Sequence, residues 1–350
     1  MNLSSQIAIV IRSIGERTTE ACLKSIEAQG FARSEITVTH ASPFSEALRQ
    51  SLEAGRKAGK DWTFIVDADV ILRHDAIARM HQVACSRPDR VCEVHGLVLD
   101  KLFNEFRLAG NHMYRTSLIP KVLECVSHEG QISRPETHAL NAMSAAGFPV
   151  EKVAVNIGLH DFEQRCIDIF RKCFLQAHKH IQRSGTFLPL WRERGQEDPD
   201  FRVALEGFVF GLHYTPDVMA DAEDDAVRAA FEKLGIPEKS GVFAHPDPAG
   251  WATEVTDRAI SGNSVNVIGF ELDARDLDQA RPLRHLALSR AQTIEKLTRD
   301  HGSLRSGIYM IGEGLERIGR MVKLRSGARL AHRGDTSSPV NAKPLRTTPL

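Results

Sequence analysis

The chain has 350 residues, of which 42% are hydrophobic and 26% are charged, and its formal net charge is zero. This balance excludes a global basic field, so we expect no nucleic-acid partner. The six cysteines are scattered without a CxxC pair, which excludes a disulfide scaffold and favours a reducing cytoplasm. No apolar run approaches the roughly 20 residues that span a bilayer, so we expect no transmembrane segment, while peripheral contact with the inner membrane stays open.

Strand and helix patterns alternate in the first part of the chain. Residues 7–11 (IAIVI), 35–40 (EITVTH) and 61–70 (DWTFIVDADV) each predict a strand. The stretches 13–30 and 44–59, which separate them, carry apolar residues at helical spacing. A β-α-β-α-β order predicts a parallel sheet that is covered by helices on both faces.

The alternation continues to about residue 184, and the texture then changes. Later patterns predict a helix at 74–85, a strand at 90–100, a strand and turn at 108–119, a helix at 133–147, a strand running into a helix at 153–164, and a long helix after it. We predict an α/β domain over residues 1–184, with a Rossmann-like, mostly parallel sheet flanked by helices. A mainly helical region should follow over 185–325, and a disordered tail over 326–350.

Two aspartates interrupt the third predicted strand, in the stretch FIVDADVIL. Asp67 and Asp69 lie at its C-terminal end, where open parallel sheets bind ligands. Carboxylates at i and i+2 of an extended chain point to the same side. They suit Mg²⁺ or Mn²⁺, which prefer oxygen ligands. The alternative is a strand end that simply exits to solvent.

This arrangement resembles the GT-A fold glycosyltransferases, in particular those of family 2, over roughly residues 6–180. The resemblance rests on the β-α-β-α-β start and on a D-x-D that follows the third strand. It implies a GT-A-like sheet, a nucleotide-sugar donor, and transfer of the sugar to an acceptor hydroxyl on a saccharide, lipid or protein. It also implies that Asp67 and Asp69 bind the Mg²⁺ or Mn²⁺ ion that holds the donor diphosphate.

A histidine late in the catalytic domain often completes the metal or diphosphate site in that family, and His160 in GLHDFEQ matches this placement. A neutral imidazole is a suitable ligand for Mn²⁺. The alternative is that the stretch only starts a helix, because Asp161 and Gln164 have N-cap and N3 spacing.

The family also implies a carboxylate general base at the start of a helix in the acceptor half. Glu136 in SRPETH has that position, and Asp161 and Glu163 are its rivals. The family's usual pair of adjacent acidic residues is absent, since Thr137 follows Glu136. The alternative is a capping box, because Ser133 and Glu136 form S-x-x-E.

The loop after the first strand, in IVIRSIGERT, departs from the Pro-Thr-Tyr-Asn type sequence that family 2 members commonly carry. By resemblance, Arg12 and Ser13 lie beside the nucleotide, where either Arg12 or Arg17 suits a diphosphate. A helix cap formed by Ser13 and Glu16 explains the same residues. His40, at the end of the second strand, stands where the family places a residue that contacts the nucleotide base.

Three functions therefore remain open. The first is a metal-dependent glycosyltransferase, and the second is a nucleotide-sugar-binding or scaffold protein with a GT-A-like fold and no turnover. The third is a phosphotransfer enzyme of the haloacid-dehalogenase kind, in which a D-x-D aspartate is the nucleophile. That motif normally follows the first strand and ends in a small pair, whereas this one follows the third strand and continues with Val70 and Ile71. Whether the chain forms a homo-oligomer also stays open.

Overall fold

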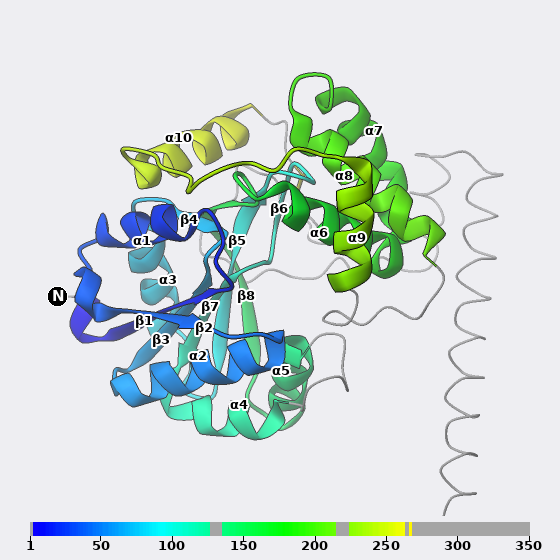
Figure 1. The fold of residues 1–350 in the computed structure, drawn as a ribbon. Helices are drawn as coiled ribbons and strands as arrows, with labels where there is room; N and C mark the ends of the chain where they lie inside the picture. The colour runs from blue at the N-terminus through cyan, green and yellow to red at the C-terminus, as the bar shows by residue number, and fades with distance from the viewer. Residues whose placement is uncertain (1–2, 127–134, 215–223, 263–265, 268–350) are drawn as a thin grey trace, which may run out of the picture. The chain divides into compact units, whose positions relative to one another are not determined.

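The structure is a computed structural model, and it describes residues 3–126, 135–214, 224–262 and 266–267. A twisted sheet forms its centre, and helices flank it (Figure 1). The strands are β1 Ile7–Ser13, β2 Ile36–His40, β3 Trp62–Asp67, β4 Val70–Leu72, β5 Glu93–Asp100, β6 Glu105–Arg107, β7 Asn111–Arg115, β8 Val150–His160 and β9 Asn266–Val267. The α-helices are α1 Thr19–Glu27, α2 Phe44–Ala58, α3 Ala76–Cys85, α4 Ile119–Cys125, α5 Pro135–Ala145, α6 Cys166–Lys179, α7 Ser184–Arg194, α8 Pro199–His213, α9 Asp224–Leu234 and α10 Pro248–Ser261. Short 3₁₀ turns lie at Leu3–Ser5, Arg33–Glu35, Thr116–Leu118 and Ile181–Arg183.

The sheet follows the order β2-β1-β3-β7-β5-β6-β9, and β8 pairs with β5 and β4. Strand β1 is parallel to both β2 and β3, as the β-α-β-α-β pattern predicts. Strand β7 returns between β3 and β5 and is antiparallel to both, which makes the sheet more mixed than a mostly parallel one. The predicted fold class is confirmed, because an α/β sheet is flanked by helices and a helical region follows it.

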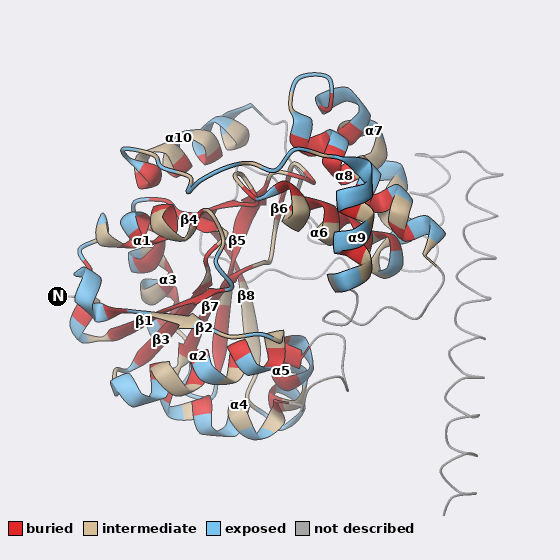
Figure 2. Ribbon diagram, in the orientation of Figure 1, coloured by how far each residue is buried: buried red, intermediate tan, exposed pale blue. Residues whose placement is uncertain are grey.

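The two faces of the sheet are both buried, which explains the unbroken apolar runs in β1 and β3. Ile9 and Phe64 belong to the core beneath α1 and α3. Val10 and Ile65, one position along, belong to the core beneath α2, α4 and α5. Figure 2 shows the strands buried between these two helical layers. The alternation follows from the two-residue period of a strand.

A second core of large aromatic side chains lies among α6, α7, α8 and α9. Phe170, Trp191 and Phe208 are almost fully buried there, and each contributes about 1.5–3 kcal/mol by leaving water. Gly207 lets α8 approach α6 closely, because a Cβ at this position would collide with the carbonyl oxygen of Phe170.

The predicted division into domains stays a prediction. Residue 184 begins α7, and helices on both sides of it contribute to the aromatic core. The described residues all belong to one compact unit, Met1–Leu286. The predicted tail at 326–350, like every residue after 267, lies outside the described residues.

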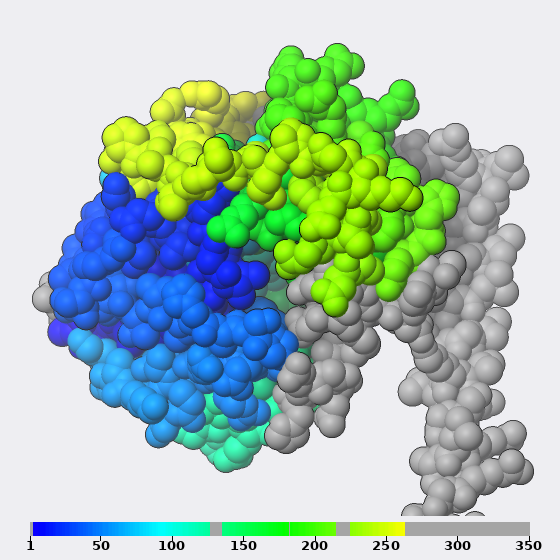
Figure 3. Space-filling view, in the orientation of Figure 1, coloured from blue at the N-terminus to red at the C-terminus, as the bar shows by residue number. Residues whose placement is uncertain are grey.

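The chain between α9 and α10 runs across the face of the molecule that Figure 3 presents. It meets the loop after β1, where the Phe243 amide donates a hydrogen bond of 2.8 Å to the Arg17 carbonyl. Among the described helices, none is both long and apolar enough to cross a lipid bilayer.

Candidate active site

The D-x-D stretch forms a turn at the carboxyl end of β3. Asp67 ends that strand, and Ala68 and Asp69 turn the chain into β4. The predicted single strand over 61–70 is therefore wrong, because the chain bends at the aspartates. The Asp67 amide donates to the Gly110 carbonyl at 2.9 Å, and the Ala68 amide donates to the Arg12 carbonyl at 2.9 Å. These bonds fix the turn.

Gly110 is required where it lies. Its φ is +58°, a left-handed conformation that favours glycine. A Cβ there would also come within 2.7 Å of Val70 Cγ2 and 3.3 Å of Asp67 Oδ2. The backbone of the loop before β7 can therefore approach the D-x-D turn only because position 110 carries no side chain.

Asp69 lies in a cluster of ionisable residues that we call the outer cluster. Its members are Asp69, Asp100, His160, Asp161 and Lys172. The His160 ring directs Nε2 at Asp69 Oδ2, at 3.6 Å. Its Nδ1 lies 3.0 Å from Asp100 Oδ2 and 3.1 Å from Asp161 Oδ2. Asp69 and His160, both predicted as metal ligands, are thus brought together.

Lys172, on α6, reaches into this cluster from the helical layer. Its ammonium group forms an ion pair with Asp161 Oδ1 and lies 3.6 Å from Asp69 Oδ2. Burial alone would lower the pKa of Lys172, but the neighbouring carboxylates, Asp161 above all, hold it above its ordinary value. The chain thus places an ammonium group of its own beside the D-x-D aspartate.

One carboxylate oxygen of the outer cluster is placed to bind a further cation. Oδ1 of Asp69 is buried, and no described residue donates a hydrogen bond to it. Burial raises the pKa of the Asp69 carboxyl. Asp69, His160 and Asp161 offer one ligand atom each within a span of 4.8 Å. Carboxylate oxygens with one imidazole nitrogen fit Mg²⁺ or Mn²⁺, so the residues fit the predicted ion.

Asp161 is held in an unusual backbone conformation. Its φ is +65°, and α6 begins only at Cys166 with Arg165 as its N-cap. The alternative that Asp161 caps a helix is therefore wrong. Instead, the turn at residues 161–165 aims the Asp161 carboxylate at His160 and Lys172.

Asp67 faces away from the outer cluster and toward Arg12. The guanidinium Nε donates to Asp67 Oδ1 at 2.7 Å, and Nη1 donates to Glu136 Oε1 at 3.0 Å. The ring of Phe44 lies 4.9 Å from the guanidinium carbon. Arg12 and Ser13 lie within β1 rather than in the loop after it. Arg12 therefore links the D-x-D turn to Glu136.

Glu136 is the centre of a buried network that we call the inner cluster, formed by Glu93, His112, Tyr114 and Glu136. The Tyr114 hydroxyl donates to Glu136 Oε1 at 2.9 Å, and His112 Nε2 lies 3.1 Å from Glu136 Oε2. His112 Nδ1 lies 2.8 Å from Glu93 Oε1. Each oxygen of the Glu136 carboxylate therefore has a partner.

This environment bears on the predicted general base. Burial would raise the pKa of Glu136, but Arg12 and His112 hold it well below its usual range. A carboxylate that is already paired with three donors accepts a further proton poorly. The assignment of Glu136 as the base stays a prediction, and the geometry supports a role in holding Arg12.

A cavity of about 390 Å³ lies at the D-x-D turn, within the range of small-molecule sites. Its lining combines acidic residues near the ends of β1 and β3, and one on α6, with basic residues of the helical layer. The acidic residues are Glu16, Asp67, Asp69 and Asp168, and the basic residues besides Arg12 are Arg165, Arg171 and Arg228. Burial raises the pKa of the Glu16 and Asp168 carboxyls, so these two can exchange a proton closer to neutral pH.

The remaining predicted residues lie at or near this cavity. Ser13 lines it, and its hydroxyl donates to Glu16 Oε2 at 2.6 Å in a loop that precedes α1. Their pairing is therefore not a cap, since α1 begins at Thr19 with Thr18 as its N-cap. His40 is exposed at the end of β2, next to the cavity residues Ala41 and Ser42.

The sequence did not single out Lys172, Arg165, Arg171 or Arg228. Lys172 and Arg171 lie on α6 and Arg228 lies on α9, where a charged residue looks like any solvated one, and Arg165 directly precedes α6. The sequence interpretation also missed Glu93 and His95, although a signal was present. Both occur at alternate positions of an otherwise apolar strand pattern, RVCEVHGLVLD, and polar groups in such a place are usually paired.

No family model matches this sequence, and no curated protein matches it. Solved structures share parts of its fold. One is a glycosyltransferase involved in glycosylation of the major capsid of PBCV-1, with 11% identity, a TM-score of 0.30, and coverage of 43% of this chain and 84% of the other. S. aureus TarS 1–349 has 13% identity and a TM-score of 0.30, and the match covers 73% of this chain and 92% of TarS 1–349. A CMP:2-keto-3-deoxy-manno-octonic acid synthetase complexed with CTP has 10% identity and a TM-score of 0.32, and the match covers 45% of this chain and 92% of the synthetase. At these scores, none of the likenesses assigns an activity to this chain.

Proposed function

We propose that this protein is a metal-dependent glycosyltransferase of the GT-A kind, similar to family 2, that uses a nucleotide sugar. One observation carries the proposal. The D-x-D turn at the end of β3 lines the same cavity as Arg165, Arg171 and Arg228. Aspartates that suit a divalent cation and guanidinium groups that suit a phosphate are thus placed around one space of suitable size.

Asp69, His160 and Asp161 would hold Mg²⁺ or Mn²⁺. When bound, the ion would neutralise the charge of the leaving nucleoside diphosphate. The cavity arginines would bind the phosphate oxygens, since their planar donor forks match that geometry. Asp67 and Ser13 line the cavity and would contact the donor, while Arg12 fixes the Asp67 carboxylate through its 2.7 Å hydrogen bond.

A carboxylate must take the proton of the acceptor hydroxyl. The predicted base, Glu136, does not line the cavity in the part of the chain that is described. Asp168 does line it, and burial raises its pKa. Substitution separates the two. If Asp168 is the base, Asp168→Asn should abolish transfer while donor binding persists, and Glu136→Gln should retain some transfer.

A second function, binding of a nucleotide sugar without a metal or turnover, is favoured by one observation. Both D-x-D aspartates already have a protein cation nearby. Arg12 pairs with Asp67, and Lys172 lies 3.6 Å from Asp69. A protein that binds a nucleotide sugar without metal or turnover would have this arrangement. A phosphotransfer enzyme is less favoured, because Asp67 is tied to Arg12 instead of being free to attack.

Thermal unfolding with a panel of nucleoside diphosphates and nucleotide sugars, each with and without Mn²⁺, tests the proposal. At 100 times its dissociation constant a ligand should add about 2.7 kcal/mol to the free energy of unfolding. Stabilisation should need Mn²⁺ and should vanish in Asp69→Ala. Asp89→Ala is the matched control, because that side chain is fully exposed. Stabilisation that ignores Mn²⁺ and Asp69 would support binding without a metal, and none at all would refute the donor site.

A further inference from the structure

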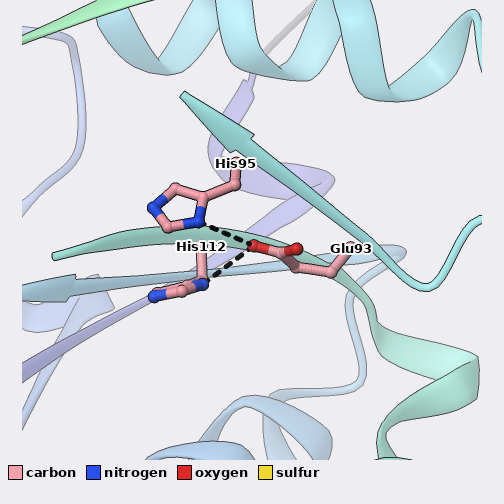
Figure 4. A group of neighbouring side chains, drawn as sticks. All are labelled: Glu93, His95 and His112. Atoms are coloured by element: carbon pink, nitrogen blue, oxygen red, sulfur yellow. Dashed lines mark hydrogen bonds and ion pairs between the residues drawn. The ribbon is translucent and has the colours of Figure 1, made fainter. Parts of the chain in front are cut away.

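A second group of possible metal ligands lies in the interior, on two neighbouring strands. Glu93 and His95 are two positions apart on β5, so their side chains share one face of the sheet. Strand β7 pairs antiparallel with β5 in a register that opposes Glu93 to Tyr114 and Val94 to Met113. His112 therefore lies beside His95, with ring centroids 4.3 Å apart. Figure 4 shows the two imidazole rings turned toward the Glu93 carboxylate.

The donor atoms of these three side chains converge. Oε1 of Glu93 lies 2.8 Å from His112 Nδ1 and 3.9 Å from His95 Nδ1. One ligand atom from each residue falls within a span of 4.8 Å. This spacing is close to that of three ligands around one metal ion, because metal–nitrogen and metal–oxygen bonds near 2 Å place neighbouring ligands a little over 3 Å apart.

His112 is also oriented as a metal ligand would be. Its other ring nitrogen, Nε2, lies 3.1 Å from Glu136 Oε2. Metal-binding histidines almost always donate their second N–H to a carboxylate or carbonyl, which fixes the ring and leaves the free nitrogen for the metal. Glu136 supplies that contact here, so Nδ1 of His112 is directed at Glu93.

Two polar atoms of the group lack a hydrogen-bonding partner. Oε2 of Glu93 and Nε2 of His95 are buried, and nothing in the described residues bonds to either. Glu93 is wholly buried. A buried polar group without a partner costs about 1–3 kcal/mol. A bound cation would offset that cost at the carboxylate.

We propose that Glu93, His95 and His112 form a buried site for a divalent transition-metal ion, separate from the outer cluster, with Zn²⁺ as the best match. Two imidazoles and one carboxylate are a common zinc ligand set and leave a fourth position for water. Without the metal, a proton shared by His112, Glu93 and Glu136 offsets the charge of the two carboxylates. On binding, the ion displaces that proton, which leaves to solvent. The His95 side chain, at 12% exposure, is the most exposed of the three ligands.

The metal content of the full chain, purified without chelator or affinity metal, tests the proposal together with Zn²⁺ titration. Titration in the Asp69→Ala background removes binding at the outer cluster. We expect one zinc per chain and a Zn²⁺-dependent rise in Tm in that background. His95→Gln and Glu93→Gln should lose both. Glu136→Gln should weaken zinc by about 10–100-fold, the usual cost of losing the residue that orients a ligand.

His213→Gln is the matched control, since His213 is exposed on α8, and it should keep the zinc. Circular dichroism checks that each variant is folded. His95→Gln is the most informative variant. His95 makes no hydrogen bond to any described residue, so the substitution breaks none of them. A folded protein that binds no zinc, or zinc that survives both His95→Gln and Glu93→Gln, would show that the group holds a proton only. Because these residues are distinct from Asp69, that result leaves the proposed transferase function untouched.

Discussion

The outer and inner clusters contain the same kinds of groups, carboxylates and an imidazole, yet their surroundings differ. Asp69 of the outer cluster lines the cavity at the D-x-D turn. Among the described residues, no member of the inner cluster lines that cavity. Glu136 of the inner cluster has partners on both oxygens, while one oxygen of Asp69 has no hydrogen-bonding partner among the described residues. The inner cluster should therefore matter most for stability, and the outer cluster for ligand binding.

Removing the centre of the inner cluster should have the largest effect. Glu136→Ala leaves Arg12, His112 and Tyr114 without their shared acceptor. Breaking a buried ion pair in this way costs about 3–5 kcal/mol. Urea unfolding measures the loss, with the half-exposed surface residue Glu53 changed to Ala as the control. A loss below about 1 kcal/mol, combined with lost transfer, would instead favour Glu136 as the general base.

The corresponding change in the outer cluster should affect binding more than stability. Asp69→Asn removes a buried charge with an unpaired oxygen, so the unfolding free energy of the ligand-free protein should hardly fall. The stabilisation by Mn²⁺ with a nucleoside diphosphate, about 2.7 kcal/mol at 100 times the dissociation constant, should disappear. If the ligand-free protein instead loses several kcal/mol, the contrast between the clusters is wrong.

Gly110 lies against the D-x-D turn, and Gly59, which also has a positive φ, provides a control. Their φ values are +58° and +65°, but a Cβ at Gly59 would meet nothing within 4 Å. Gly59→Ala should therefore cost only the left-handed conformation, about 1–2 kcal/mol. Gly110→Ala should cost more, because it also pushes on Val70 and Asp67, and it should weaken donor binding. Equal losses in chemical denaturation would mean that the close approach is unimportant.

Lys172 should compete with the metal for the outer cluster. Lys172→Met removes the ammonium beside Asp69 and Asp161, so Mn²⁺ should bind about tenfold more tightly, or about 1.4 kcal/mol. Isothermal titration of Mn²⁺ measures this, with the exposed Lys24→Met as the control. Weaker Mn²⁺ binding in a folded variant would show that Lys172 supports the ion instead of replacing it.

The sequence predicted those features that depend on local pattern. The apolar runs of β1 and β3 predict buried strands, and these occur at Ile7–Ser13 and Trp62–Asp67. The position of Asp67 and Asp69 at a strand end also follows from the pattern. The bend at Ala68 was not predicted, because it depends on hydrogen bonds to Arg12, on β1, and to Gly110, in the loop before β7.

The parts of the site that the sequence did not reveal are contacts between distant segments. Arg12 and Glu136 are separated by 124 positions, and Lys172 reaches the outer cluster from a helix that begins after β8. Periodicity identifies the buried face of such a helix, but it does not tell which polar residue points at a partner. His160 was singled out through the resemblance to GT-A glycosyltransferases, and in the sheet it pairs with Val70, directly after the D-x-D turn. Its role as a metal ligand stays a prediction.

The most direct test is a crystal structure with Mn²⁺ and a nucleoside diphosphate, recorded at the manganese absorption edge. We expect anomalous density within coordination distance of Asp69 and His160, with the diphosphate between the ion and the cavity arginines. Density only at Glu93, His95 and His112, or a diphosphate bound by the arginines with no manganese near Asp69, would contradict this expectation.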